Sequence, residues 1–344
     1  MKLLVTGGAG FIGSHFVRER FQRHPDDEIV VLDNLTYAGH LDNLAEVKDR
    51  PGYRFVRADV CDQRAVQDAM EGCEVVIHLA AESHVDRSIT NAAPFLTTNV
   101  QGTFTLLEAA RTHKLKTFVH TSTDEVYGPI LEGAYAEDAP LRPRSPYAAS
   151  KAAADLLVQA YQETYGVSAM VVRPTNVFGP RQLPEKFIPL CLTNALVGEP
   201  LPLYGDGLQR RSWLFVSDLC RALDDVVAHG EAGAIYNVPS PWELPNREVA
   251  RLILHLLNQP EALIQHVPDR PGHDRRYAME GAPLARLGWH PSVAFEDGLR
   301  QTIAWYQEHP EWWQPRKARL REDPYHWLNR PVGARARQAT GALA

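Results

Sequence analysis

The sequence predicts an α/β protein built on a doubly wound parallel sheet, with a second, smaller lobe of mixed α/β structure. Two features indicate this fold. Short, continuous apolar runs alternate with helical patterns over the first half of the chain, and a glycine-rich turn follows the first run. Such runs are typical of parallel strands that helices cover on both faces. The chain has 344 residues, which is enough for more than one domain.

The expected strands follow one another along the first half of the chain. They cover residues 3–5, 28–32, 53–56, 74–79, 117–120 and 169–173, and a helix begins at about Ile12. Beyond residue 175 prolines become frequent and the helical patterns become shorter, which indicates the smaller lobe. Residues 234–238 form one more apolar run, which we expect to return to the main sheet.

These patterns divide the chain into three parts. Residues 1–175 form the sheet domain, together with a returning segment near 210–240, and residues 176–325 form most of the smaller lobe. Residues 326–344 are rich in Arg, Ala and Gly and have no apolar period, so we expect a loosely ordered tail there.

The composition argues against several classes of protein. A net charge of −6 lacks the basic excess that is usual in nucleic-acid-binding proteins. No apolar stretch approaches the roughly 18 residues of a membrane span, and the N-terminus does not resemble a signal peptide. The four cysteines lack the spacing of a disulfide framework, and the 14 histidines lack the spacing of metal ligands. We therefore expect a cytoplasmic protein that binds no nucleic acid, membrane or metal.

The glycine-rich turn indicates a dinucleotide site of the Rossmann type. Gly7, Gly10 and Gly13 follow the first strand and lead into a helix. Glycine lets the backbone approach a pyrophosphate closely, and the helix N-terminus attracts its negative charge. Asp33 ends the second strand, where a carboxylate can accept hydrogen bonds from both ribose hydroxyls and repels a 2′-phosphate. The expected cofactor is therefore NAD rather than NADP.

Two further strand ends lie at the same edge of the predicted sheet. Asp59 and Val60 follow the third strand, and Leu79, Ala80 and Ala81 follow the fourth. Because ligands bind outside the carboxyl ends of the strands in open α/β sheets, we expect these residues to line the adenine and ribose.

A tyrosine and a lysine one helical turn apart form the expected catalytic base. Tyr147 and Lys151 begin an alanine-rich helix as Y-x-x-x-K, so their side chains share a face. A nearby ammonium stabilises a phenolate and should lower the pKa of Tyr147 from its usual value of about 10. The pair is then able to take the proton of a substrate hydroxyl while hydride leaves the same carbon. Such a pair is common by chance, and its place behind a dinucleotide turn makes it informative.

The fifth strand runs into Thr123, Asp124 and Glu125. Thr123 is placed to hydrogen-bond the substrate hydroxyl or the Tyr147 phenol, and the two acids follow at the edge where ligands bind. Adjacent carboxylates usually belong to a solvated loop. Two acids in one pocket can instead differ in pKa, so that one acts as an acid and the other as a base. Elimination of water needs such a division.

Several stretches resemble the dTDP-glucose 4,6-dehydratases, a family of extended short-chain dehydrogenases/reductases. The resemblance covers roughly residues 1–316, and it is carried by residues 33–39, 80–88, 122–128, 184–189 and 269–277. The Thr-Asp-Glu triplet at 123–125 is the most specific part. Related decarboxylases and GDP-mannose dehydratases carry another residue in place of Asp124, and 4-epimerases usually lack the Asp-Glu pair.

The resemblance implies a redox-neutral cycle on dTDP-glucose. Tyr147, helped by Lys151 and Thr123, takes the proton of the 4-hydroxyl while hydride passes from carbon 4 to NAD. Glu125 then removes the proton of carbon 5, Asp124 protonates the hydroxyl that leaves carbon 6, and the hydride returns to carbon 6. The product is a 4-keto-6-deoxy sugar nucleotide, and the enzyme should retain its NAD between turnovers.

The resemblance also implies the binding residues. Besides Tyr147 and Lys151, further cofactor contacts are expected from Phe11, Ile12, Asn34, Leu35, Thr36, Ser83 and Thr98. Ser83 and Thr123 should also contact the sugar. The smaller lobe should hold the nucleoside diphosphate, whose two phosphates need cations and donors. The residues expected for this are Asn176, Lys186, Phe187, Pro202, Tyr204, Arg211, Asn246, His273, Arg275 and Tyr277.

Three short segments depart from the family pattern. The family commonly has two asparagines and a tyrosine before Gly179, where residues 176–178 read Asn-Val-Phe. It commonly has Arg-Asp-Trp-Leu-Tyr where residues 211–215 read Arg-Ser-Trp-Leu-Phe, and residues 180–183 replace a more aromatic stretch. None of these segments touches the catalytic set, so they bear on the nucleotide and the sugar, and the choice between thymidine and uridine stays open.

Two alternatives remain at this point. Another redox-neutral sugar-nucleotide enzyme, a 4-epimerase or a UDP-sugar decarboxylase, is disfavoured by Asp124. A non-catalytic NAD-sensing protein is disfavoured because Tyr147 and Lys151 are both present. The helices expected at about 95–112 and 147–165 have alanine-rich faces, and such helices form a four-helix interface in similar proteins, so we expect a homodimer.

Overall fold

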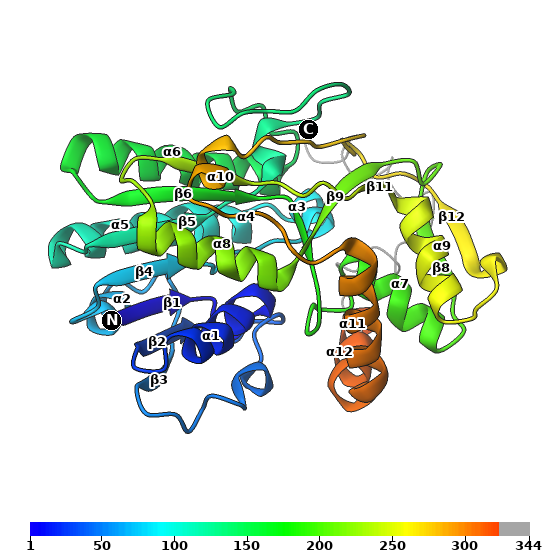
Figure 1. The fold of residues 1–344 in the computed structure, drawn as a ribbon, viewed down its shortest axis with the longest axis horizontal. Helices are drawn as coiled ribbons and strands as arrows, with labels where there is room; N and C mark the ends of the chain where they lie inside the picture. The colour runs from blue at the N-terminus through cyan, green and yellow to red at the C-terminus, as the bar shows by residue number, and fades with distance from the viewer. Residues whose placement is uncertain (323–344) are drawn as a thin grey trace, which may run out of the picture.

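A seven-stranded sheet is the largest of the sheets in the computed structural model, which describes residues 1–322. Its order is β10-β6-β5-β4-β1-β2-β3, and every neighbouring pair is parallel. The strands are β1 (Lys2–Thr6), β2 (Glu28–Asp33), β3 (Tyr53–Arg57), β4 (Val75–His78), β5 (Thr117–Thr121), β6 (Ala169–Pro174) and β10 (Ile235–Val238). This order, with helices between the strands, confirms the predicted doubly wound fold (Figure 1).

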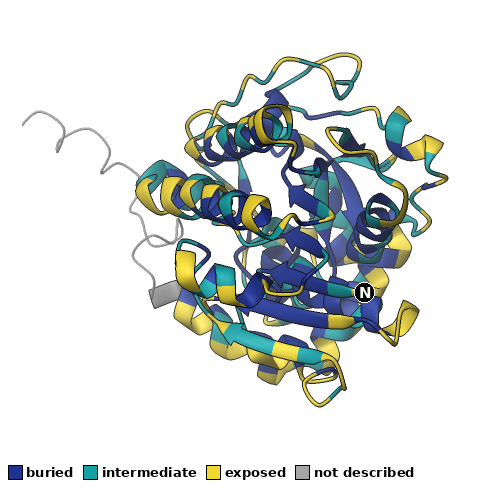
Figure 2. Ribbon diagram, turned by 90° about the vertical axis from the view of Figure 1, so that its left-hand side faces the viewer, coloured by how far each residue is buried: buried dark blue, intermediate teal, exposed yellow. Residues whose placement is uncertain are grey.

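Helices cover both faces of this sheet. The long ones are α1 (Phe11–Arg23), α2 (Gln63–Met70), α5 (Gly102–His113), α6 (Pro146–Tyr165) and α8 (Val216–His229). Because successive strand residues point to opposite faces, Leu3 and Val5 pack with α1 and α8, whereas Leu4 packs with α2, α5 and α6. Figure 2 shows the strands largely dark blue between helices with exposed outer faces.

Short helical segments connect the larger elements. They are η1 (Leu41–Leu44), α3 (Val85–Thr90), α4 (Ala93–Phe95), η2 (Leu96–Gln101), η3 (Asp124–Tyr127) and α10 (Ala282–Arg286). The helix expected at about 95–112 is present as an uninterrupted helical run over residues 93–113, in which η2 is a π-helical segment between α4 and α5. Such wide turns are rare and frequently occur at functional sites.

The start and end of α6 are fixed by local sequence. The side chain of Ser145 accepts a hydrogen bond from the backbone N–H of Ala148, and Pro146 occupies the first helical position. Gly166 ends the helix in the left-handed conformation, which glycine adopts without strain. The first two turns of α6 thus carry Tyr147 and Lys151 beside the carboxyl end of β5.

The late strand that the sequence predicts at 234–238 is β10, which pairs with β6. The smaller lobe has a three-stranded sheet, β11-β9-β7, and a two-stranded sheet, β12-β8. Its elements are β7 (Asn176–Phe178), α7 (Phe187–Leu196), β8 (Leu201–Tyr204), β9 (Arg210–Phe215), β11 (Glu243–Pro245), α9 (Asn246–Leu256), η4 (Glu261–Leu263), β12 (Ile264–Val267), α11 (Phe295–Glu308) and α12 (Pro310–Glu322). Its core includes Phe178, Trp213, Phe295 and Tyr306.

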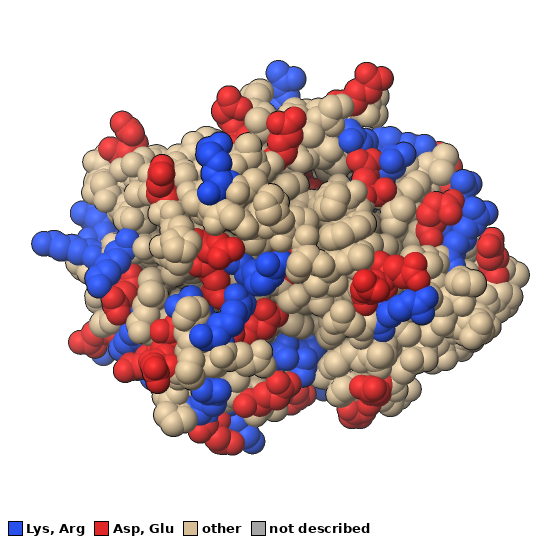
Figure 3. All heavy atoms as spheres, in the orientation of Figure 1, with Lys and Arg blue, Asp and Glu red and all other residues tan. Residues whose placement is uncertain are grey.

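Other sequence expectations can be compared with the described residues only in part. Over residues 1–322, no helix combines the length and apolarity that a membrane crossing needs. Within the same residues, no cluster of His, Cys, Asp and Glu is arranged to hold a metal ion. Figure 3 shows acidic and basic side chains interspersed on one face of the molecule. The tail expected at 326–344 lies outside the described residues.

Candidate active site

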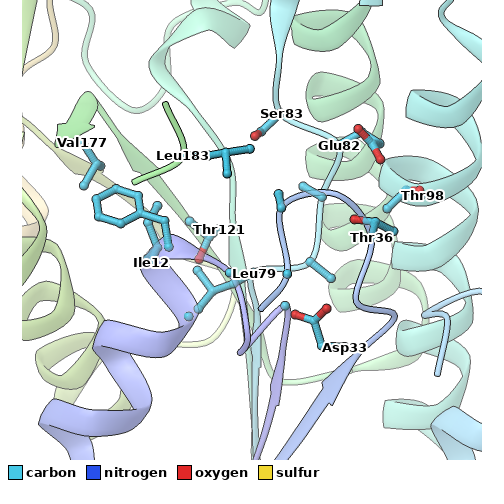
Figure 4. A pocket seen from close by; sticks show the side chains of 18 of the residues that line it. Ile12, Asp33, Thr36, Leu79, Glu82, Ser83, Thr98, Thr121, Val177 and Leu183 are labelled. Carbon is cyan, nitrogen blue, oxygen red and sulfur yellow. The ribbon is translucent and has the colours of Figure 1, made fainter. Parts of the chain in front are cut away.

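A cavity of about 320 Å³ lies at the carboxyl ends of the central strands and extends to the smaller lobe. In Figure 4, Asp33, Thr36 and Thr98 lie on one side of it and Ile12 and Val177 on the other. Twenty-one of the expected site residues line it: Gly7, Gly10, Phe11, Ile12, Gly13, Asp33, Asn34, Thr36, Asp59, Val60, Leu79, Ala80, Ala81, Ser83, Thr98, Thr123, Asp124, Glu125, Tyr147, Asn176 and Lys186. The structure therefore brings the two halves of the predicted site to one cavity.

The glycine turn packs too closely for any larger residue. A Cβ on Gly13 would lie 2.2 Å from the carbonyl oxygen of Gly7, and one on Gly7 would lie 2.6 Å from the nitrogen of Ala80. Gly7 also has a φ of +68°, which L side chains rarely adopt. The first backbone N–H groups of α1 have no partner within the helix and so can face an anion in the cavity.

Asp33 lies where a ribose-binding carboxylate is expected. Its Oδ2 accepts from the backbone N–H of Ala9 at 3.0 Å, and its Oδ1 accepts from that of Leu35 at 2.8 Å. Burial raises the pKa of this carboxyl above its usual value. Leu35 itself is absent from the cavity lining within the described residues, and it contacts the site through its backbone hydrogen bond to Asp33. Asn34 donates to Oδ2 of Asp59 at 2.8 Å, which links the two strand ends.

Polar atoms without partners mark the cavity wall. Among the described residues, Nε2 of His40, Oγ1 of Thr121 and Oδ1 of Asn176 are buried, line the cavity and have no hydrogen-bond partner. Buried polar groups normally have partners, because leaving one unpaired costs about 1–3 kcal/mol. Together with the glycine turn and Asp33, these atoms fit a ligand rich in hydroxyl, phosphate and amide groups, such as a dinucleotide.

Tyr147 and Lys151 lie on one face of α6, but their electrostatics differ from the expectation. The ammonium of Lys151 donates to the carbonyl of Thr121 at 2.7 Å, and burial lowers its pKa to about 8. Burial and the nearby Glu125 carboxylate raise the pKa of Tyr147 above its usual value. The expected lowering of the phenol pKa is therefore wrong for this structure, because the effect of burial is larger. Lys151 is also absent from the lining of the described part of the cavity.

A buried network lies behind Lys151. Nε2 of His120 is 3.4 Å from the ammonium of Lys151 and 3.4 Å from Oδ1 of Asp155. The second oxygen of Asp155 accepts from Nε of Arg173 at 2.9 Å, and Arg173 donates to the hydroxyl of Tyr127 at 2.6 Å. Burial lowers the pKa of His120 to about 4, so this ring is neutral at physiological pH. The network fixes Lys151 and the end of β5 relative to each other.

The carboxyl group of Asp124 has a raised pKa, which favours its neutral, protonated form. Asp124 is 3% exposed, and burial together with the neighbouring Glu125 raises its pKa to about 7. Its Oδ1 lies 3.2 Å from Oγ1 of Thr123, and its Oδ2 lies 3.0 Å from Oγ1 of Thr175. Such an acid is still partly protonated at neutral pH and is able to donate a proton.

Glu125 has a different electrostatic environment. Burial raises its pKa, but Arg270, Arg211 and Lys186 all act to lower it. Because three cations favour the charged form of Glu125 and the Glu125 charge favours the neutral form of Asp124, the pair has the asymmetry that an acid and a base require.

Of the residues expected to bind the nucleoside diphosphate, some line the cavity and others do not. Lys186 lines the cavity, and its ammonium donates to the carbonyl of Ser83 at 2.6 Å. The guanidinium of Arg211 lies 4.4 Å from the ring centre of Tyr277, and the Tyr277 hydroxyl donates to Asp274 at 2.7 Å. Eight expected residues of the smaller lobe are not among the lining residues that the structure describes: Phe187, Pro202, Tyr204, Arg211, Asn246, His273, Arg275 and Tyr277.

Besides Tyr277, three of these eight residues contact acidic partners, and His273 does so through Asp269 at 2.6 Å. The hydroxyl of Tyr204 donates to Oδ2 of Asp86 at 3.0 Å, and the ring of His273 lies edge-on to Tyr204. Arg275 forms an exposed, bidentate pair with Asp206, at 2.7 Å and 3.0 Å. A guanidinium can bind a phosphate with the same bidentate geometry. In this structure the carboxylate of Asp206 takes the hydrogen bonds that Arg275 could give to a phosphate.

Sequence reasoning missed several residues at the cavity. The π-helical η2 places the buried side chain of Asn99 so that its amide bonds both backbone groups of Glu82, at 2.9 Å and 3.0 Å, and donates to Ser150 of α6 at 2.9 Å. Asn99 thereby joins the loop after β4 to the catalytic helix. Unexpected residues that line the cavity include His40, Glu82, Thr121, Thr175, Val177, Arg181, Gln182, Leu183, Glu185 and Trp312. The sequence signals for some of them were the departures at 176–178 and 180–183 and the family stretches at 80–88 and 184–189.

Comparisons with known proteins agree with this geometry. The family model described as GDP-mannose 4,6 dehydratase matches residues 4–302. A dTDP-glucose 4,6-dehydratase from Streptomyces niveus is 50% identical over 323 residues, which covers 92% of this chain and 96% of that protein. The chain belongs to the dTDP-glucose 4,6-dehydratase family.

Solved structures also separate this family from its neighbours. DesIV, a dTDP-glucose 4,6-dehydratase from Streptomyces venezuelae crystallised with NAD, has a TM-score of 0.90 and 49% identity, covering 92% of this chain and 100% of that chain. A UDP-glucose 4-epimerase from Thermus thermophilus has a TM-score of 0.82 and 35% identity, covering 89% of this chain and 99% of that chain. The fold is shared with the epimerases, while the similarity to the dTDP-glucose 4,6-dehydratases is greater.

Proposed function

We propose that the protein converts dTDP-glucose to dTDP-4-keto-6-deoxyglucose, as a dTDP-glucose 4,6-dehydratase with NAD as its cofactor. The observation that carries this proposal is the pair of the buried Asp124 and the half-buried Glu125, which lies beside Tyr147 in the cavity that the dinucleotide turn also lines. When bound, NAD supplies an acceptor for the hydrogen of sugar carbon 4 and a donor of that hydrogen to carbon 6. The protein has to move protons in the correct order.

The first proton is that of the sugar 4-hydroxyl. We assign it to Tyr147, whose phenol lines the cavity beside Thr123. A phenol with a raised pKa is a poor base unless a positive charge stabilises the phenolate. Lys151 supplies such a charge from one turn along α6. Its ammonium is held in place by the carbonyl of Thr121, so it need not be ordered during the reaction.

The second and third protons belong to the elimination. Oxidation at carbon 4 acidifies the proton on carbon 5, and we assign its removal to Glu125, whose charged form three cations favour. We assign protonation of the departing carbon 6 hydroxyl to Asp124, whose pKa of about 7 keeps a neutral fraction at physiological pH. Because the hydride that leaves carbon 4 is returned at carbon 6, no net redox change remains. Glu125 gives its proton back to carbon 5, Tyr147 releases to solvent the proton that it took, and Asp124 regains one from solvent.

Asp124 also discriminates against the alternatives. A 4-epimerase only removes hydrogen from carbon 4 and returns it to the other face, so it needs no acid for a leaving hydroxyl. A decarboxylase loses carbon dioxide and likewise needs none. A buried carboxyl with a raised pKa is costly to the fold, and its presence here therefore favours elimination of water.

Incubation with dTDP-glucose tests the proposal. The purified protein should convert dTDP-glucose without added NAD, and the sugar nucleotide should lose the mass of one water. The matched variant Tyr147→Phe should leave the mass unchanged. A product of unchanged mass with inverted carbon 4 would instead assign an epimerase. Faster conversion of UDP-glucose than of dTDP-glucose would keep the reaction and change the nucleotide.

We also propose that the protein is a homodimer joined through η2, α5 and α6. Large apolar side chains are exposed along these elements, with Leu96 57%, Phe104 39%, Leu156 56% and Tyr165 54% exposed. Clustered exposure of this kind marks an interaction surface, and two copies of α5 and α6 would cover it. Light scattering should give a dimer for the parent protein and a monomer for Leu156→Asp. The control Leu131→Asp, on another exposed leucine, should stay dimeric, and a monomeric parent protein would refute the proposal.

The cellular compartment is likewise a proposal. The four cysteines are unpaired, and three of them are buried. Unpaired cysteines suit a reducing compartment, so we propose that the enzyme acts in the cytoplasm. Recovery of its activity in the cytoplasmic fraction of the source cells would support this, and recovery outside the cell membrane would refute it.

A further inference from the structure

The wall of the cofactor cavity is completed by residues far from the sheet domain in sequence. Arg181, from the loop after β7, and Trp312, from α12, line the same cavity as Gly10, Phe11 and His40. In Figure 1, α11 and α12 lie at the lower edge of the smaller lobe, on its side toward α1. We call Arg181 and Trp312 the outer wall.

Trp312 is connected to the dinucleotide turn by hydrogen bonds. Its indole N–H donates to Oδ1 of Asn43 at 3.0 Å, and Nδ2 of Asn43 donates to the carbonyl of Ala9 at 2.9 Å. Ala9 lies between Gly7 and Gly10, and its own N–H donates to Asp33 at 3.0 Å. Trp312 and Asn43 are 7% and 1% exposed, so water does not compete freely for these bonds.

The Ala9 peptide is therefore fixed at both ends. Asp33 holds its N–H, while Asn43 and the backbone N–H of His40 both donate to its carbonyl. Fixing this peptide fixes the direction of the neighbouring turn, whose N–H groups must face a pyrophosphate. Trp312 donates the outermost of these connected hydrogen bonds, so α12 supports the glycine turn through Asn43.

Arg181 adds charge and packing to the same wall. Its guanidinium lies 5.3 Å from the ring centre of Trp305, and Trp305 packs edge-on against Trp312 at 5.0 Å. It pairs with Glu46 at 2.6 Å, and Glu46 is mostly exposed. Arg181 also has a φ of +63°, a conformation that costs a residue other than glycine about 1 kcal/mol or more. Its position is thus specific and places a cation beside a cavity suited to an anionic ligand.

We propose that Trp312, acting through Asn43, and Arg181 retain the dinucleotide between turnovers. Trp312 keeps the glycine turn in its binding geometry, and Arg181 supplies positive charge at the outer wall. Both are cofactor-retaining residues rather than catalytic residues, and the inference rests on the proposed function only for the identity of the cofactor. A redox-neutral cycle gains from retention, because NAD does not need to exchange between turnovers.

Exchange of bound NAD tests this inference without any sugar nucleotide. The holoenzyme is mixed with isotopically labelled NAD, and the bound fraction is followed by mass spectrometry. Trp312→Phe keeps an aromatic side chain but replaces the indole by a smaller ring without an N–H, so it leaves Oδ1 of Asn43 unpaired and should speed exchange by about tenfold or more. The adjacent Trp313→Phe is the matched control. The Trp313 indole also donates a buried hydrogen bond, to Tyr306, but Trp313 does not line the cavity of the described residues, and exchange should stay at the parent rate.

Two more variants test the connection and the charge. Asn43→Asp cannot donate to the carbonyl of Ala9. If Asn43 and Trp312 act through the same connected hydrogen bonds, the double variant should exchange NAD little faster than Trp312→Phe alone. Arg181→Gln should speed exchange several-fold, whereas Arg18→Gln, which also loses a contact with Glu46, should not.

Equal exchange in Trp312→Phe and Trp313→Phe, or additive effects at Asn43 and Trp312, would overturn the role of Trp312. Parent-like exchange in Arg181→Gln would overturn the role of Arg181. Because no turnover is measured, these outcomes are independent of the dehydratase assay.

Discussion

The hydroxyl of Thr175 lies 3.0 Å from Oδ2 of Asp124 and 3.1 Å from the carbonyl oxygen of Ser212. A hydroxyl has one proton and cannot donate to both oxygens. If Asp124 is neutral, it donates to Thr175, which in turn donates to Ser212, and every group is satisfied. If Asp124 is charged, either its oxygen or the carbonyl loses a donor. The geometry thus favours the neutral form of Asp124, and the pKa of about 7 keeps part of it in that form at neutral pH.

Replacement of Asp124 by Asn should separate two steps of the reaction. General acid catalysis typically contributes 10²- to 10⁴-fold, so Asp124→Asn should lower the rate of water loss by about that factor. Glu125 is unchanged in this variant and should still exchange the carbon 5 proton. In heavy water, mass spectrometry should therefore find deuterium at carbon 5 of unreacted substrate.

The matched variant Glu125→Gln should behave differently. Without a base for carbon 5, it should lose both the exchange and the elimination, although Asp124 is present. If the two variants gave the same exchange, the separate roles of Asp124 and Glu125 would be wrong.

The raised pKa of Asp124 also predicts how stability depends on pH. The folded protein holds the proton up to about pH 7, while the unfolded chain releases it near pH ~4. Folding therefore takes up a proton between these values, and the contribution of Asp124 to stability falls as pH rises through this window. Asp124→Asn has no carboxyl to ionise and so avoids this loss. The unfolding free energy of the variant minus that of the parent should therefore rise by on the order of 2–3 kcal/mol from pH 5 to pH 8. Urea unfolding at the two pH values measures this, and parallel pH dependence in both proteins would contradict it.

The buried Asp155 should be structurally important behind the catalytic lysine. Asp155→Asn would leave Arg173, which is 1% exposed, without its charged partner. Breaking a buried pair by removing one partner typically costs 3–5 kcal/mol, so urea unfolding should show a loss of about that size. Arg300→Ala removes an exposed pair with Glu296 and should change stability by less than about 1 kcal/mol. Equal losses in the two variants would show that the Asp155 network contributes no more than a surface pair.

The glycine turn should be sensitive to a single methyl group. In Gly13→Ala the new Cβ would lie 2.2 Å from the Gly7 carbonyl, so the turn must move and the purified protein should contain little NAD. Gly10→Ala brings a Cβ only to 3.2 Å of the same oxygen and should keep more of the cofactor. Release of NAD by denaturation, followed by chromatography, gives the content of each protein. Full occupancy in Gly13→Ala would contradict the role given to this turn.

Much of the fold could be predicted from periodicity because the relevant contacts are local or repeat along the chain. Apolar runs such as residues 28–32 and 169–173 identify strands that are buried on both faces, and the glycine spacing identifies the turn. Asp33 was predictable because the end of the second strand has a fixed place beside the dinucleotide turn. The π-helical segment η2 could not be predicted, because one wide helical turn hardly changes the apolar pattern of the sequence.

The outer part of the site depends on distant contacts and could not be predicted. Trp312 reaches Asn43 across 269 positions of sequence, and no local signal records such a contact. The pKa of Tyr147 was predicted in the wrong direction because a spacing of four residues shows the lysine but not the burial of the phenol or the nearby Glu125. The resemblance supplied the substrate residues of the smaller lobe, and their roles stay predictions.

The most direct test of the account follows the hydrogen of sugar carbon 4. dTDP-glucose labelled with deuterium at carbon 4 is converted in ordinary water, with no added NAD, and the product is analysed by NMR and mass spectrometry. The account predicts that the deuterium appears on carbon 6 of the 4-keto-6-deoxy product, because the same bound cofactor takes it and returns it. Deuterium lost to water, or retained on carbon 4 of an inverted sugar, would contradict internal transfer in this cavity.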